Sequence, residues 1–157
     1  MATARPPVEG RIPPKLVLRT VNPFMRVLLR SPLHRLASKT VLLLTVTGRK
    51  SGRTYTVPVG RHESGGGLVV CADGTWRVNL RGGAPVKVTL DGAERDGFAE
   101  LHEDSDTVAR TYLEVLEGLG LRRARNLGLK LNVDRMPTVD EIKPAVAGRG
   151  IARVRLN

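Results

Sequence analysis

The feature that most restricts the fold of this chain is a change of hydrophobic period after residue 40. From there apolar and polar residues alternate in short runs separated by glycine-rich turns, a pattern typical of half-buried β-strands. These runs span 41–47, 54–62, 67–72, 85–90, 94–102 and 151–156. One later stretch, 106–120, has helical spacing and glycines near its end. The pattern predicts an α+β fold, a small barrel of mainly antiparallel strands capped by helices.

The residues before the barrel differ in composition. Residues 1–15 contain four prolines and are predicted to form a loose arm. Residues 16–39 are cationic and contain no acidic residue, and we expect N-terminal helices there, interrupted at Ser31-Pro32. The length of 157 residues fits one domain. We therefore expect a single domain over 1–157, with the barrel and its helix, 106–120, in residues 40–157.

Charge and cysteine usage limit the possible partners. The formal net charge of +11 implies a negatively charged partner. Cys71 is the only cysteine, so no internal disulfide can form and a reducing, cytoplasmic location is expected. The histidines at 34, 62 and 102 lack the spacing of metal ligands, so no metal is expected. The longest apolar run, 41–44, is too short to span a bilayer.

The stretch VTGRKSGRTYTVPVGRH, residues 46–62, concentrates cations around two glycines. One interpretation is an ordinary hairpin turn built on Gly48 and Gly52 with solvated charges. The other is an anion site, because glycine-rich turns expose backbone N–H groups, and Arg49 and Lys50 suit phosphate or carboxylate oxygens. The spacing does not match a nucleotide P-loop.

The stretch CADGTWRVNLRGGAPVKV, residues 71–88, contains the only tryptophan, Trp76, three residues before Asn79. It is interpreted either as a plug at one barrel end, with Asn79 closing a turn, or as the border of a planar ligand that Asn79 hydrogen-bonds. The residues alone leave both interpretations open.

Taken together, LLLTVTGRKSGRTYTVPVG followed by TWRVNLRGGAPVKV, behind NPFMRVLLRSPLHRLASK, resembles the deazaflavin-dependent nitroreductase family. These are split-barrel oxidoreductases that use coenzyme F420, and the resemblance covers about residues 20–102. It implies a split β-barrel enzyme that transfers hydride from reduced F420 to an electron-poor acceptor such as a quinone or an enone.

The resemblance also implies the residues that contact the cofactor. By position, the anionic tail would meet Arg49, Lys50, Ser51 and Gly52. Arg53 and Tyr55 are also assigned to the cofactor site: Tyr55 stands where many members have an arginine, and that tail contact is either missing or taken over by Arg53. The deazaflavin ring would be bordered by the backbone of Thr56, Val57 and Pro58 and by Ala72 and Asp73, with Trp76 and Asn79 closing the pocket. No catalytic residue is identified, and Tyr55, Asp73 and water are unranked sources of a proton. The chain departs from the family pattern at Tyr55 and Gly60, and nitroimidazole reduction is not expected.

The sequence also allows other partners and functions. A non-catalytic or differently loaded barrel would bind flavin (FMN), lipid or another cofactor. Nucleic acid is not expected, since no recognised motif is present and aromatics make up 3% of the chain. Residues 16–39 are either a helical cap on the barrel or a contact with an anionic membrane at its inner face. The sequence does not predict an oligomeric state.

Overall fold

A computed structural model describes residues 5–11, 27, 31, 41–65 and 67–157. Its main feature is a closed barrel with the strand order β2-β3-β4-β8-β6-β5, in which every pair is antiparallel. The strands are β2 (Val41–Thr47), β3 (Thr54–Ser64), β4 (Gly67–Ala72), β5 (Ala84–Leu90), β6 (Ala93–His102) and β8 (Gly150–Leu156). The predicted α+β fold with an antiparallel barrel is confirmed.

Successive side chains of a strand point to opposite faces, and in β2 one set fills the barrel while Leu43, on the other face, is also 0% exposed. In β2, Leu42, Leu44 and Val46 are at most 1% exposed and pack into the barrel interior. Because a slip of one residue would turn all three away from the core, this pattern also sets the register of β2 against β3. Each of the six barrel strands lies within two residues of its predicted range.

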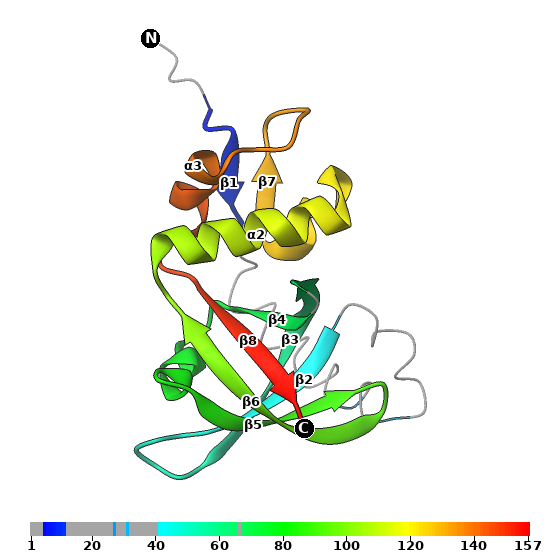
Figure 1. Cartoon of the computed structure of the whole chain (residues 1–157), viewed down its shortest axis with the longest axis vertical. Helices are drawn as coiled ribbons and strands as arrows, with labels where there is room; N and C mark the ends of the chain where they lie inside the picture. The colour runs from blue at the N-terminus through cyan, green and yellow to red at the C-terminus, as the bar shows by residue number, and fades with distance from the viewer. Residues whose placement is uncertain (1–4, 12–26, 28–30, 32–40, 66) are drawn as a thin grey trace.

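The predicted helix over 106–120 is α2 (Ser105–Leu119). It begins at Asp104, whose carboxylate accepts from the Thr107 N–H, an ordinary helix N-cap. Its apolar face, with Val108, Tyr112 and Leu116 buried, joins a second core outside the barrel. Figure 1 shows α2 lying across the molecule between the barrel and a small cap.

The cap corrects one prediction. Within the arm predicted to be loose, Val8–Gly10 form β1, which pairs antiparallel with β7 (Leu129–Leu131). Val8 is 2% exposed in the second core, so apolar burial orders a segment whose proline-rich composition suggested none. The cap also contains α3 (Val139–Ile142) and the 3-10 helices η3 (Leu121–Leu127) and η4 (Lys143–Val146).

Two further points bear on the predictions. The cationic helices expected over 16–39 lie outside the described residues, apart from the single positions 27 and 31. Within the described part of the chain, no helix is long and apolar enough to cross a membrane. A further 3-10 helix, η2 (Thr75–Leu80), follows β4 and contains the tryptophan.

Candidate functional site

A broad groove, here called the turn groove, lies between the β2–β3 turn and η2. It has a volume of about 760 Å³. The residues that line it are Gly48, Arg49, Lys50, Ser51, Tyr55, Thr75, Trp76, Val78, Asn79 and Arg81. The basic turn and the tryptophan segment, which the sequence separates, therefore form two walls of one surface.

Asn79 ties these two walls together. The Arg49 N–H donates to Asn79 Oδ1 at 3.1 Å, and Asn79 Nδ2 donates to the Trp76 carbonyl at 3.0 Å. The Arg49 guanidinium also donates to the Arg81 carbonyl. Arg49 is thus engaged in the wall itself, whereas the exposed Lys50 ammonium has no side-chain partner among the described residues. Among the cations that line the turn groove, Lys50 is therefore the most available to a ligand.

The position of η2 depends on Glu103, which comes just before α2. Its carboxylate accepts from Arg77 Nε at 3.1 Å and from Arg81 Nε at 2.9 Å. These contacts, with the Arg81 hydrogen bond the largest cause, lower the pKa of Glu103. Solvent-accessible ion pairs contribute little to stability. We therefore infer that the main role of Glu103 is to orient η2.

A second hollow, here called the strand groove, follows β3 on the side facing η3. It has a volume of about 400 Å³. The residues that line it are Arg11, Val57, Pro58, Val59, Gly60, His62, Cys71, Asp73, Gly74, Trp76, Arg125, Asn126, Leu127 and Gly128. Apolar strand residues thus form its wall, while exposed Arg11 and Arg125 lie at its rim.

Trp76 is common to both grooves. Its indole lies directly over Gly74, where an added Cβ would be 2.4 Å from Trp76 Nε1. Any larger residue at position 74 would therefore displace the indole. The half-buried ring also packs against the barrel core, so the junction between the two grooves is a fixed apolar plane.

Polar groups at the inner end of the strand groove are not poised as nucleophiles. Burial raises the pKa of the Cys71 thiol to about 12, so the thiol is protonated at neutral pH. The Tyr112 hydroxyl donates to Asp73 Oδ1 at 3.3 Å. Burial by its neighbours raises the pKa of Asp73 and the Arg149 charge opposes the rise. Since Asp73 remains exposed, solvent limits this effect.

The predicted cofactor residues line one of the two grooves, both of them or neither. The turn groove brings together Arg49, Lys50, Ser51, Tyr55, Trp76 and Asn79. The strand groove brings together Val57, Pro58, Asp73 and Trp76. Gly52, Arg53, Thr56 and Ala72 are not among the residues that line either groove. The Ala72 side chain is buried inside the barrel, and the Thr56 hydroxyl is hydrogen-bonded to that of Thr45 at 2.9 Å.

Several lining residues were not foreseen as site residues. Arg81 and residues 125–128 carry no local signal, since the chain brings them to the grooves only by tertiary packing. His62 did offer one, because it follows Pro58 and Gly60 at even spacing. Residues so spaced point to one face of a strand, here the face that lines the strand groove.

His62 also yields a prediction about stability and pH. Burial lowers the pKa of its imidazole below the ordinary 6.5, so below pH 6.5 the unfolded chain binds more protons at this residue than the folded one. The His62 contribution to the free energy of unfolding should then fall as the pH falls below 6.5. Urea unfolding of the native protein and of His62→Leu between pH 7 and 5 measures it.

Because the pKa of Asp73 is raised, its contribution to the free energy of unfolding should rise as the pH falls. This contribution is the same in the native protein and in His62→Leu. The native protein should therefore lose more stability than His62→Leu over this range. Parallel pH profiles for the two proteins would contradict the assignment.

Comparison with known families gives one match. A family model described as F420H(2)-dependent quinone reductase matches residues 18–117, more than half of the chain. The matched region includes both the basic turn and the tryptophan segment. No curated protein matches the chain.

Solved structures give distant likenesses. A protein described as F420-H2 dependent reductase (FDR-A) is 20% identical with a TM-score of 0.47, over 74% of this chain and 95% of that one. A conserved hypothetical protein from Mycobacterium tuberculosis is 15% identical with a TM-score of 0.46, over 99% and 86%. A heme binding protein from Mycobacterium smegmatis is 15% identical with a TM-score of 0.42, over 78% and 48%. At this distance these likenesses carry no argument about function.

Proposed function

Because this chain belongs to the F420H(2)-dependent quinone reductase family, we propose that its two grooves together hold the deazaflavin cofactor. The family makes the protein an F420H2-dependent oxidoreductase, which confirms the predicted activity class. The finer proposal is that the turn groove takes the anionic tail and the strand groove takes the ring. The two grooves meet at Trp76, so one extended molecule can occupy both.

The side chains of the turn groove fit a phosphate and carboxylate tail. The Lys50 ammonium has no partner among the described residues, and Arg49 and Arg81 add positive charge to the groove. The Ser51 hydroxyl and the Tyr55 hydroxyl lie 3.3 Å apart on the same wall and supply neutral donors. Charge-assisted bonds to phosphate oxygens are about twice as strong as neutral ones, so this groove is suited to an anion.

The strand groove fits a flat, largely apolar ring. Pro58 and the backbone of Val57 form one wall and the Trp76 indole closes one end, an arrangement typical of sites for planar cofactors. The indole is held in place by Gly74 beneath it and by the barrel core behind it. A ring placed there is shielded from solvent on these two sides.

The mechanism divides between cofactor and protein. Reduced F420, when bound, supplies a hydride with its two electrons. The chain itself binds and orients: Lys50 and Ser51 fix the tail, and Pro58, the Val57 backbone and Trp76 position the ring and exclude water. The Cys71 thiol, protonated at neutral pH, takes no nucleophilic part.

For the acceptor we propose a small electron-poor carbonyl compound, a quinone or an enone. The open strand groove supports a small molecule beside the ring, and the family description supports a quinone. The alternative is that the barrel binds FMN or another cofactor in place of F420, and an experiment must distinguish the two.

The observation that carries the proposal is the meeting of a cationic groove and an apolar groove at one tryptophan. Titration of the purified protein with oxidised F420, and separately with FMN, tests it. We expect saturable quenching of cofactor fluorescence with F420 and a much weaker response to FMN. Tighter binding of FMN, or no saturation with F420, would contradict the proposed site.

Replacing Lys50 by alanine should raise the F420 dissociation constant by about 10- to 100-fold, because a charge-assisted hydrogen bond contributes about 1.5–3 kcal/mol. The melting temperature should stay unchanged, since loss of an exposed charge alters stability by less than about 0.5 kcal/mol. Isothermal titration and thermal unfolding measure the two effects. Arg95→Ala, an exposed cation on β6 outside both grooves, is the control and should bind F420 normally.

The membrane contact through residues 16–39 stays a prediction from the sequence. At low salt the full-length protein should sediment with anionic phosphatidylglycerol vesicles and be released at high salt, since each cation near anionic lipid adds about 1 kcal/mol. Deletion of residues 1–38 should abolish the binding if the remaining barrel stays folded. Equal binding to neutral vesicles would contradict it. A cytoplasmic location remains a prediction of the same kind.

A further inference from the structure

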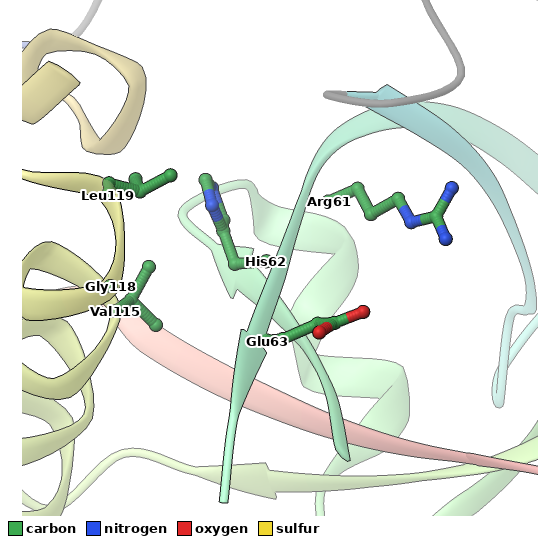
Figure 2. A pocket seen from close by; sticks show the side chains of 6 residues that line it. All are labelled: Arg61, His62, Glu63, Val115, Gly118 and Leu119. Carbon is green, nitrogen blue, oxygen red and sulfur yellow. The ribbon is translucent and has the colours of Figure 1, made fainter. Parts of the chain in front are cut away.

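His62 lies where three hollows meet. It lines the strand groove, a hollow against α2 that Figure 2 shows, and a third hollow that also borders Val41 and Arg123. In Figure 2 its ring points toward Leu119, whereas Arg61 points away on the other side of the strand. The imidazole is thus directed between β3 and the α2–η3 segment.

The ring is buried without a partner. His62 is 6% exposed, and neither Nδ1 nor Nε2 has a hydrogen-bond partner among the residues described. A buried polar group left in this state is unfavourable by about 1–3 kcal/mol. Buried polar groups are otherwise nearly always hydrogen-bonded. An imidazole without a hydrogen-bond partner at the edge of a hollow therefore indicates a ligand that supplies the missing hydrogen bond.

The absence of a side chain at Gly60 sets the position of the ring. A Cβ at Gly60 would lie 2.7 Å from His62 Nε2, so Nε2 lies directly over this glycine. Gly60 lines both the strand groove and the third hollow. Pro58, Gly60 and His62 share one strand face, so Nε2 lies further along the same wall as Pro58.

Building on the proposed cofactor site, we propose that His62 holds the carbonyl oxygen of the acceptor, in a subsite between Gly60 and η3. The subsite is bordered by Asn126, which lines both adjoining hollows, and by the exposed Arg123 and Arg125 at their rims. Its occupant is a quinone or enone whose oxygen accepts a hydrogen bond from the imidazole.

The protonation state of the ring suits this role. Because burial lowers the pKa of His62, the ring is neutral at pH 7, with one nitrogen as donor and the other as acceptor. As the acceptor receives hydride with both electrons, negative charge develops on its oxygen, and a preorganised N–H stabilises it. Solvent receives one proton from the reduced cofactor and supplies one to the acceptor, so atoms and charge balance while the imidazole keeps its proton.

Two substitutions separate this role from a structural one. His62→Leu removes both nitrogens but keeps similar volume, whereas His62→Gln keeps an N–H donor near the position of Nε2. An apolar replacement of an unpartnered polar group should be neutral or stabilising, so His62→Leu should melt at or above the native temperature. His102→Gln, a histidine on β6 that lines none of these hollows, is the matched control.

The test uses F420 titration together with steady-state reduction of menadione by F420H2. We expect His62→Leu to bind F420 like the native protein but to lose about 100-fold in kcat/KM for menadione, the effect of removing one such donor. His62→Gln should retain most of the activity. Gly60→Ala, which displaces the ring, should behave like His62→Leu.

Native kcat/KM in His62→Leu would overturn the inference, and so would unfolding of that variant. Parallel loss of F420 affinity and turnover would also overturn it, by placing His62 in the cofactor site. Failure of the native protein to bind F420 would instead refute the proposed function. The melting temperature of His62→Leu relative to the native protein would still show whether the His62 imidazole lacks a hydrogen-bond partner.

Discussion

Replacing Arg149 by alanine is expected to lower the free energy of unfolding by about 3 kcal/mol. Arg149 is 6% exposed, and its guanidinium donates to the carbonyls of Leu127 at 3.0 Å and Gly128 at 2.9 Å. Alanine would remove both hydrogen bonds, and hydrogen bonds to charged groups contribute about 1.5–3 kcal/mol each. The Gly128 carbonyl would keep the Arg11 N–H at 2.6 Å, whereas the Leu127 carbonyl would lose this donor.

The guanidinium joins several parts of the cap. It lies 5.9 Å from the centre of the Tyr112 ring in α2, and a Cβ at Gly10 in β1 would be 2.9 Å from Nη2. Leu127 and Gly128 also line the strand groove. Loss of Arg149 should therefore loosen β1, the end of η3 and one groove wall together, and weaken F420 binding as well.

Urea unfolding measures the first effect, and hydrogen exchange at Val8–Gly10 and Leu129–Leu131 locates it. Arg155→Ala is the control, because the Arg155 side chain is 76% exposed, with an ion pair to Glu100 and the Phe98 ring centre 5.9 Å from its guanidinium. Exposed pairs contribute about 0–1 kcal/mol. A loss below about 1 kcal/mol in Arg149→Ala would show that the guanidinium does not hold the cap together.

The barrel could be predicted from the sequence because its strands carry their own signal. The short apolar runs in Val41–Thr47 and Gly67–Ala72, bounded by turn residues, have strand length and composition, and the observed strands have these same bounds. The order of the strands had no such signal. That β8 lies between β4 and β6 depends on contacts between distant residues, which local patterns do not encode.

The cap was missed for a related reason. β1 and β7 have three residues each, too few for a period to be visible. Val8–Gly10 follow a proline pair, and the extended conformation that proline favours suits an open arm as well as a strand. Only the burial of Val8 against the second core decides between them.

The candidate site was predicted where its parts are local and missed where they are not. The turn with Lys50 and the segment with Trp76 were predicted together through the family resemblance, and they share one groove. Residues 125–128 belong to the strand groove but are distant from β3 in sequence. His62 lacks the spacing of metal ligands, and its even spacing from Pro58 and Gly60 indicates only a shared strand face. Its burial without a hydrogen-bond partner among the described residues cannot be predicted from spacing.

Replacing Trp76 by alanine should weaken F420 binding by about 10- to 100-fold, because loss of an aromatic contact with a planar ring is unfavourable by about 1–3 kcal/mol. The effect should be large here because the indole borders both grooves, so its removal affects ring and tail sites together. Trp76→Phe keeps an aromatic plane and should retain most of the affinity. Since Trp76 is the only tryptophan, its fluorescence reports binding in the native protein.

For the variants, which lack tryptophan, the anisotropy of F420 fluorescence supplies the dissociation constant. Phe98→Leu is the control, since Phe98 lies in β6 beneath Arg155 and lines neither groove. Trp76 packs against the barrel core, so Trp76→Ala should also lose some stability, and affinities must be compared well below its melting temperature. If folded Trp76→Ala bound F420 with native affinity, the indole would not contact the cofactor. The proposal that F420 occupies both grooves would then be refuted. Equal weakening in Phe98→Leu would instead trace the loss to the barrel as a whole.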